Sequence, residues 1–146
     1  MRLKNYTDFT DTEVRELINL VRPPGIAKFE VRVQNFRDGA FFGRGMAYTE
    51  GTSVTRHPVV IISIPRKERY ARYITEKEYG KGYLGGITLG GRKETLLFIL
   101  AHELRHLWQG KVRKGRRVWG SKGVFSERDA DAYALSKLRK YRRGEL

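Results

Sequence analysis

The sequence predicts an α+β fold in which helices pack on one face of a small antiparallel or mixed sheet. Three observations lead to this prediction. Hydrophobic residues recur at helical spacing near the N-terminus, alternate as in strands through the middle, and return to helical spacing towards the C-terminus. With 146 residues and 40% hydrophobic content, the chain can bury one core, so we expect a single domain over residues 1–146.

The first predicted element is a helix that begins near Thr10. Thr10 and Glu13 have the Thr-x-x-Glu spacing of a capping box, which satisfies free backbone N–H groups at a helix start. An apolar stripe at helical spacing follows, and two consecutive prolines end the helix. The stripe consists of Val14, Leu17, Ile18 and Val21.

The middle of the chain has the two-residue period of strands. Apolar and polar residues alternate over 28–34, which predicts a half-buried strand, and 40–48 reads as a strand interrupted by glycines. The apolar run 59–64 predicts a second clear strand, and 87–89 a short one among glycines. We expect these strands to be antiparallel. The polar and aromatic stretch 67–79 predicts a short helix or a long loop.

Two helices are predicted to close the chain. The first covers about 93–109, with Gly110 as its C-terminal stop. The second begins at Ser126, which forms a Ser-x-x-Asp capping box with Asp129, and continues to about Tyr141. Between them lies a basic loop that contains six Lys/Arg residues.

The first of these helices contains the pattern His-Glu-x-x-His, from His102 to His106. Histidines four residues apart lie on one face of a helix, so both imidazoles can reach the same ion. Zinc suits two imidazoles and an oxygen ligand, and it makes a water nucleophilic near neutral pH. Glu103 lies beside that ion and can take the proton of the water. The apolar residues around the motif predict that it is buried, where unpaired polar groups are costly and a metal would supply their partner.

A catalytic zinc usually has three protein ligands, and the second helix offers Glu127, with Asp131 one turn further along the same face. Here the sequence resembles the gluzincin branch of zinc peptidases, and in size the minimal gluzincins and the peptidases related to ImmA and IrrE. SprT-like proteases share the HExxH helix but use a third histidine. The resemblance implies a zincin-like fold with His102, His106 and Glu127 as zinc ligands and Glu103 as general base.

The same resemblance assigns Asp131 as the acceptor for the ring N–H of His102. It also places the strand 59–64 where such folds keep an edge strand that pairs with an extended substrate. The implied activity is a zinc-dependent endopeptidase that acts on a protein or peptide. Asp129 is a competing acidic candidate that helical geometry turns away from the site. Arg105, a charge within the motif, is expected to face a carboxylate or solvent.

Residues that support the reaction intermediate are left open by the sequence. An oxyanion donor is needed, and several side chains could serve, with Tyr133 better suited to the core. These candidates are Tyr48, Tyr79, Tyr83 and Tyr133. His57 is a separate candidate that could polarise the substrate or donate a proton.

The net charge of +14 is concentrated in the second half of the chain. Residues 1–65 carry 9 Lys/Arg against 7 Asp/Glu, whereas residues 66–146 carry 21 against 9. Such a field attracts polyanions, so the alternative function is a basic nucleic-acid-binding protein with a structural or vestigial metal site. The strongest candidates for non-specific phosphate contact are the basic tail 137–143 and the loop 111–123, which contains Lys111, Arg113, Lys114, Arg116 and Arg117.

Composition also bears on cofactors and location. The chain has no cysteine, which excludes a disulfide framework and a thiolate zinc site. No apolar run approaches the length of a membrane span, and the N-terminus has no apolar segment typical of a secretory signal. We therefore expect a cytoplasmic protein that does not associate with membranes.

Overall fold

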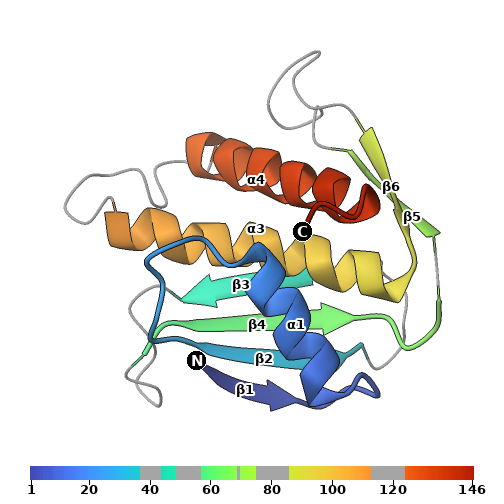
Figure 1. The fold of residues 1–146 in the computed structure, drawn as a ribbon, viewed down its shortest axis with the longest axis horizontal. Coiled ribbons are helices and arrows are strands. Elements are labelled where there is room, and N and C mark those ends of the chain that lie inside the picture. Colours follow the sequence, from blue (N-terminus) through green and yellow to red (C-terminus); the bar gives the residue numbers. More distant parts are fainter. Residues whose placement is uncertain (37–43, 49–56, 69, 75–85, 113–123) are drawn as a thin grey trace.

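The computed structural model describes residues 1–36, 44–48, 57–68, 70–74, 86–112 and 124–146 (Figure 1). It confirms the α+β class, with three helices among these residues and a small mixed sheet. In chain order the elements are β1 (Arg2–Asn5), α1 (Asp11–Val21), β2 (Glu30–Asn35), β3 (Arg44–Tyr48), β4 (Val59–Ile64), β5 (Tyr70–Ile74), β6 (Gly86–Gly90), α3 (Arg92–Val112) and α4 (Val124–Arg142).

The main sheet has the strand order β1-β2-β4-β3. Strand β1 pairs with β2, and β2 with β4, in parallel, whereas β3 pairs with β4 antiparallel. Of the two expected arrangements, antiparallel or mixed, the main sheet is mixed, and the β1–β2 and β2–β4 pairs are not antiparallel. Parallel neighbours need a crossover connection, and α1 supplies one between β1 and β2. The polar four-residue strand β1 gave no alternating pattern by which the sequence could have predicted it.

The position of β4 also differs from the expectation. Residues 59–64 form a strand as predicted, but β4 lies between β2 and β3, and among the described residues β3 is the edge strand on that side of the sheet. Val60 and Ile62 of β4 are fully buried. This explains its continuous apolar run, because a strand with neighbours on both sides and a helix over one face has little exposed surface.

Three further expectations were wrong in detail. Residues 70–74 form neither helix nor loop but strand β5, which pairs with β6, in keeping with their aromatic and β-branched content. Helix α3 continues past Gly110 to Val112. Because α4 already begins at Val124, Ser126 lies inside that helix and is not its cap. A glycine inside a helix costs only about 1 kcal/mol, which tertiary packing can outweigh.

The core lies between the main sheet and the helices. The predicted stripe of α1 is fully or almost fully buried, and Thr10 caps this helix by accepting a hydrogen bond from the Glu13 N–H at 3.1 Å. Helix α3 packs on β3 and β4 and against α1, and α4 packs along α3 (Figure 1). Because α3 lies between the sheet and α4, it is buried on opposite sides, and its mid-section is apolar apart from the motif.

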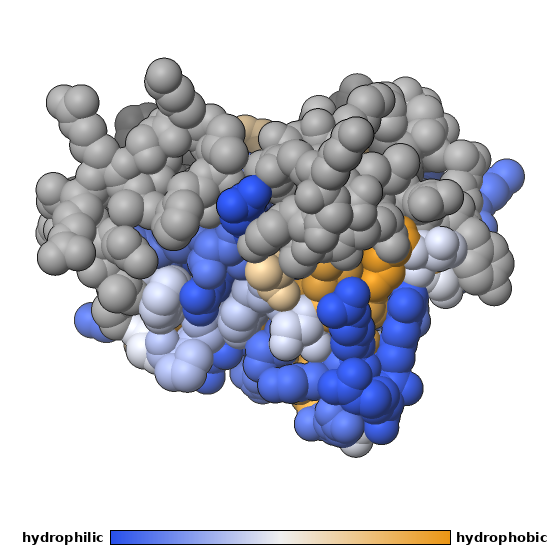
Figure 2. Space-filling view, turned by 90° about the horizontal axis from the view of Figure 1, so that it is seen from above, coloured by the Kyte–Doolittle hydropathy of each residue, from blue (hydrophilic) through white to orange (hydrophobic). Residues whose placement is uncertain are grey.

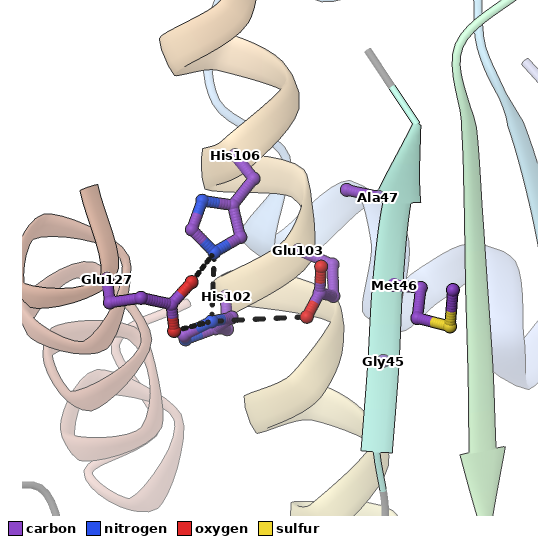
Figure 3. A pocket seen from close by; sticks show the side chains of 7 residues that line it. All are labelled: Gly45, Met46, Ala47, His102, Glu103, His106 and Glu127. Carbon is purple, nitrogen blue, oxygen red and sulfur yellow. Dashed lines mark hydrogen bonds and ion pairs between the residues drawn. The ribbon is translucent and has the colours of Figure 1, made fainter. Parts of the chain in front are cut away.

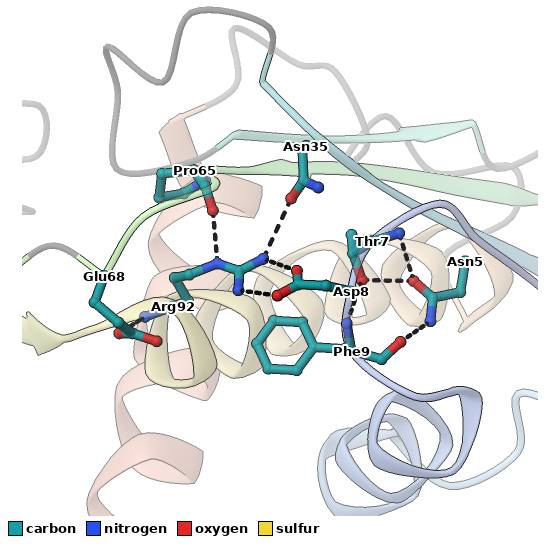
Figure 4. A network of polar contacts seen from close by, with 8 residues as sticks. All are labelled: Asn5, Thr7, Asp8, Phe9, Asn35, Pro65, Glu68 and Arg92. Carbon is teal, nitrogen blue, oxygen red and sulfur yellow. Dashed lines mark hydrogen bonds and ion pairs between the residues drawn. The ribbon is translucent and has the colours of Figure 1, made fainter.

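The start of α3 is fixed by Arg92, a buried arginine (Figure 4). Its Nε donates to the carbonyl of Pro65 at 2.8 Å, just after β4. Its guanidinium forms a bidentate pair with Asp8 at 2.9 and 2.5 Å and also donates to Asn35 at 3.3 Å. The ring of Phe9 lies 4.7 Å from the guanidinium carbon. These contacts join the helix start to the ends of β2 and β4 and to the turn before α1.

The described surface is largely polar. On the face shown in Figure 2, hydrophilic residues border one group of hydrophobic ones. Among the described residues, no helix has the length and apolar character needed to cross a membrane.

Candidate metal centre

The HExxH residues occupy one face of α3, midway along the helix. His102, Glu103 and His106 are buried, with 8%, 7% and 5% of their surface exposed. Their flanking residues Leu100 and Ala101 are fully buried, which confirms that the motif lies in the packed part of the helix. Polar groups at such depth require partners.

Glu127, in the first turn of α4, supplies the partner that faces both histidines (Figure 3). One carboxylate oxygen lies 2.6 Å from His106 Nε2, and the other lies 3.2 Å from His102 Nε2. The two Nε2 atoms are 3.1 Å apart. Within the described part of the chain, these three residues form a group whose ligand atoms all lie within 4.8 Å of one another, close enough to hold one metal ion.

The other ring nitrogens of the two histidines face oxygen acceptors. His102 Nδ1 lies 2.8 Å from Asp131 Oδ1, as the sequence led us to expect. His106 Nδ1 lies 2.9 Å from Gln109 Oε1, a partner that the sequence analysis did not single out. With both Nδ1 atoms donating, the Nε2 lone pairs and the Glu127 carboxylate converge, and all of them are acceptors. Such a group of acceptors could hold a cation, and two imidazoles with one carboxylate are a ligand set that suits zinc.

The electrostatics of the metal-free protein agree with this conclusion. Burial lowers the pKa of His102, but hydrogen bonds to Asp131 and Glu127 outweigh it and raise the pKa to about 10. Burial raises the pKa of Glu127, yet its hydrogen bonds to both histidines hold this pKa well below the usual range. The site therefore favours positive charge between the imidazoles and Glu127. Burial also raises the pKa of Glu103, against the opposing effect of the histidines.

A pocket of about 350 Å³ opens beside these side chains. Besides the two histidines, Glu103 and Glu127, it is lined by Gly45, Met46 and Ala47 of edge strand β3 (Figure 3). Glu103 lies between the histidines and β3, on the opposite side from Glu127. The histidines and both glutamates are thus reachable from one concave space.

Gly45 allows β3 to approach α3 closely at this point. It pairs with Ile62, in the row of the sheet that faces the helices. A Cβ atom at this position would lie 2.5 Å from Glu103 Cγ and 2.7 Å from Ile99 Cγ2, well inside contact distance. Only glycine therefore fits here without movement of the neighbours. The sequence shows a glycine-interrupted strand but not which helix it faces.

The structure also places residues that the sequence left open. The Arg105 guanidinium pairs with Asp129, at 2.7 and 3.1 Å, so this arginine does face a carboxylate. The Tyr133 hydroxyl donates to the carbonyl of Val21 at 2.6 Å, at the end of α1, and thus ties helices together. His57 is exposed.

Several of the candidate donor and phosphate-contact side chains lie outside the described residues. The side chains of Tyr48 and Lys111 lie outside the described residues, although both residues fall within β3 and α3 respectively. The other members of these sets also lie outside the described residues: Tyr79, Tyr83, Arg113, Lys114, Arg116 and Arg117.

Comparison of the chain with protein families, with curated proteins and with solved structures finds no match. The residues of the site and their arrangement are therefore what indicates a function for this protein.

Proposed function

We propose that this chain is a zinc-dependent endopeptidase with a zincin-like arrangement of strand, active-site helix and ligand-bearing helix. One observation carries the proposal. Two imidazole nitrogens and a carboxylate converge as acceptors at one point, beside a further buried carboxylate, and all of them line a pocket next to an edge strand. A structural site would be closed by its ligands, whereas this one faces a concave space that a substrate can enter.

In this proposal His102, His106 and Glu127 hold the metal. A bound zinc ion would supply Lewis acidity, which polarises a water and the substrate carbonyl. Asp131 accepts the Nδ1–H of His102 and thereby keeps the Nε2 lone pair directed into the site.

Glu103 serves as the general base. Its carboxylate is buried, lies 3.9 Å from His102 Nε2 and is held between α3 and β3. Burial raises its pKa, and a carboxylate with a raised pKa accepts a proton more readily than an exposed one does. The proton taken from the attacking water can then pass to the leaving amine.

Edge strand β3 provides the means to hold an extended peptide. Strand β3 pairs with β4 along one of its two edges. The β3 residues that line the pocket do so together with Glu103. A substrate that adds to this strand by backbone hydrogen bonds would place its carbonyl next to the site. The role assigned to residues 59–64 from the family resemblance thus passes to 44–48.

The decisive experiment measures zinc content and hydrolysis of an unfolded protein substrate in wild type, Glu103→Gln and Glu127→Gln. We expect Glu103→Gln to retain zinc and to lose at least about 100-fold in rate, since general-base catalysis contributes that much. We expect Glu127→Gln, a matched change of charge, to weaken zinc binding itself. A wild-type protein that takes up no zinc would refute the proposal. Proteolysis that survives in Glu103→Gln would refute the role of Glu103.

A further inference from the structure

Gln109 is a buried amide, 3% exposed, located one turn after His106 on α3. Its Oε1 lies 2.9 Å from His106 Nδ1, and its Nε2 lies 2.8 Å from Asp129 Oδ2 on α4. The side chain therefore bridges a proposed zinc ligand and the neighbouring helix. Such a position inside a packed interface is costly for an amide unless both of its ends are satisfied.

The partners of Gln109 determine which way its amide points. The Asp129 carboxylate also accepts from Arg105, whose Nε and Nη2 lie 2.7 and 3.1 Å away. An arginine can only donate and an ionised carboxylate can only accept, so the NH₂ group of Gln109 must face Asp129. The amide oxygen then faces His106, whose Nδ1 has to carry the proton. This leaves the His106 Nε2 lone pair directed at Glu127 and His102.

The far end of this chain of hydrogen bonds is itself held in place. The guanidinium carbon of Arg105 lies 3.7 Å from the ring centre of Trp108 and 5.0 Å from that of Tyr133. Stacking of a guanidinium on aromatic faces is favourable and restricts its rotation. Since Tyr133 belongs to α4 and Trp108 to α3, the arginine is clamped between the two helices that carry the proposed ligands.

We propose that Arg105, Asp129 and Gln109 together are positioning residues for the second zinc ligand, fixing His106 as its Nδ1–H tautomer with Nε2 aimed at the metal. The consequence for metal affinity rests on the proposed function. The two histidines differ in their supports, because His102 is held by a carboxylate and His106 by a neutral amide. Arg105 thus has a defined task within the motif, and Asp129 acts on the metal site without being a ligand.

The test compares wild type with Gln109→Met, which keeps the length of the side chain but cannot accept from His106, and with Gln109→Glu, which retains an acceptor oxygen. Zinc dissociation constants are measured by competition with a chelator, and thermal unfolding of the zinc-free proteins serves as the control for folding. We expect Gln109→Met to weaken zinc binding about 10- to 100-fold, as other losses of a ligand's supporting hydrogen bond do. Gln109→Glu keeps an acceptor for His106 but loses the donor to Asp129, so we expect it to recover only part of this loss.

A second readout reports the tautomer directly. The chain has 3 histidines, so ¹⁵N-histidine spectra resolve each ring. We expect His106 to bind zinc through Nε2 and to carry its proton on Nδ1, in the zinc-free protein at alkaline pH as well. Wild-type zinc affinity in a folded Gln109→Met variant, or a proton on Nε2 of zinc-free His106, would overturn the inference. A wild type that binds no zinc or cleaves no protein refutes the proposed function, and the zinc-free spectrum still decides the role of Gln109.

Discussion

Under the proposed function, replacing Gly45 by alanine is expected to impair hydrolysis while leaving the proposed metal ligands intact. The added Cβ would lie 2.5 Å from Glu103 Cγ and 2.7 Å from Ile99 Cγ2. Carbon atoms in contact are normally about 3.5–4.0 Å apart, so β3 and α3 must separate, or Glu103 must move, by about 1 Å. Of these two side chains, only that of Glu103 lines the pocket, so it has open space beside it into which it can shift.

This geometry sets the expected magnitudes. Adding one carbon to a packed interface costs about 1–3 kcal/mol of unfolding free energy. A displacement of about 1 Å of a catalytic group costs about 100-fold in rate. Zinc affinity should change little, because neither histidine nor Glu127 is among the atoms that the new Cβ would meet.

The assay follows proteolysis, zinc stoichiometry and urea unfolding in parallel. Gly90→Ala is the matched control, since its Cβ would lie 3.1 Å from the end of the flexible Glu94 side chain, remote from the motif in sequence. This control should keep its hydrolytic rate. A Gly45→Ala protein that is folded, loaded with zinc and as active as wild type would contradict the close packing of β3 on Glu103.

Three other predictions concern stability. Arg92→Met should lower the unfolding free energy by about 2–3 kcal/mol, because one buried and several partly buried hydrogen bonds are lost. Asp8→Asn should cost less, since the side chain of Asp8 is 72% exposed. Equal losses in urea unfolding would contradict the network of Figure 4. The hydrogen bond from Arg142 lowers the pKa of Glu94 below 4.5, so the pair stabilises the protein above that pH and the contribution is lost as the pH falls through the lowered pKa. Glu94→Gln should therefore destabilise by less than about 1 kcal/mol at neutral pH and by nothing in strong acid, and an undiminished difference in acid would refute this assignment. Removal of zinc by a chelator should lower the unfolding temperature. The lost free energy of unfolding is about 4 kcal/mol where the free zinc concentration had been about 1,000 times its dissociation constant. An unchanged unfolding temperature would argue against metal binding.

The local elements were largely predictable because their signals are local. The capping residue Thr10, the apolar stripe of α1 and the run 59–64 all behave as their patterns indicate. The grouping of His102, His106 and Glu127 also follows from helical spacing and from a carboxylate at the start of the next helix.

The tertiary relations were not predictable in the same way. Local sequence patterns do not reveal the order of strands in a sheet. The family resemblance therefore placed residues 59–64 at the edge that β3 occupies. Gln109 carries no pattern of its own, since its role depends on the partner that α4 brings to it. Gly45 likewise shows its importance only once Glu103 is seen against it. In each case the deciding contact joins residues that are distant in the sequence.

The hydrogen bond between Tyr133 and Val21 joins residues 112 positions apart in the chain. It bears on whether the two helices that carry the proposed ligands could form the site without the rest of the protein. A peptide that contains only α3 and α4 has all the proposed ligands, but it lacks the sheet on which α3 packs and the helix end that holds Tyr133. Such a fragment would have to order two helices at the expense of its affinity for zinc. Transplanting this site into another protein therefore requires the N-terminal strands and α1 as much as the motif itself.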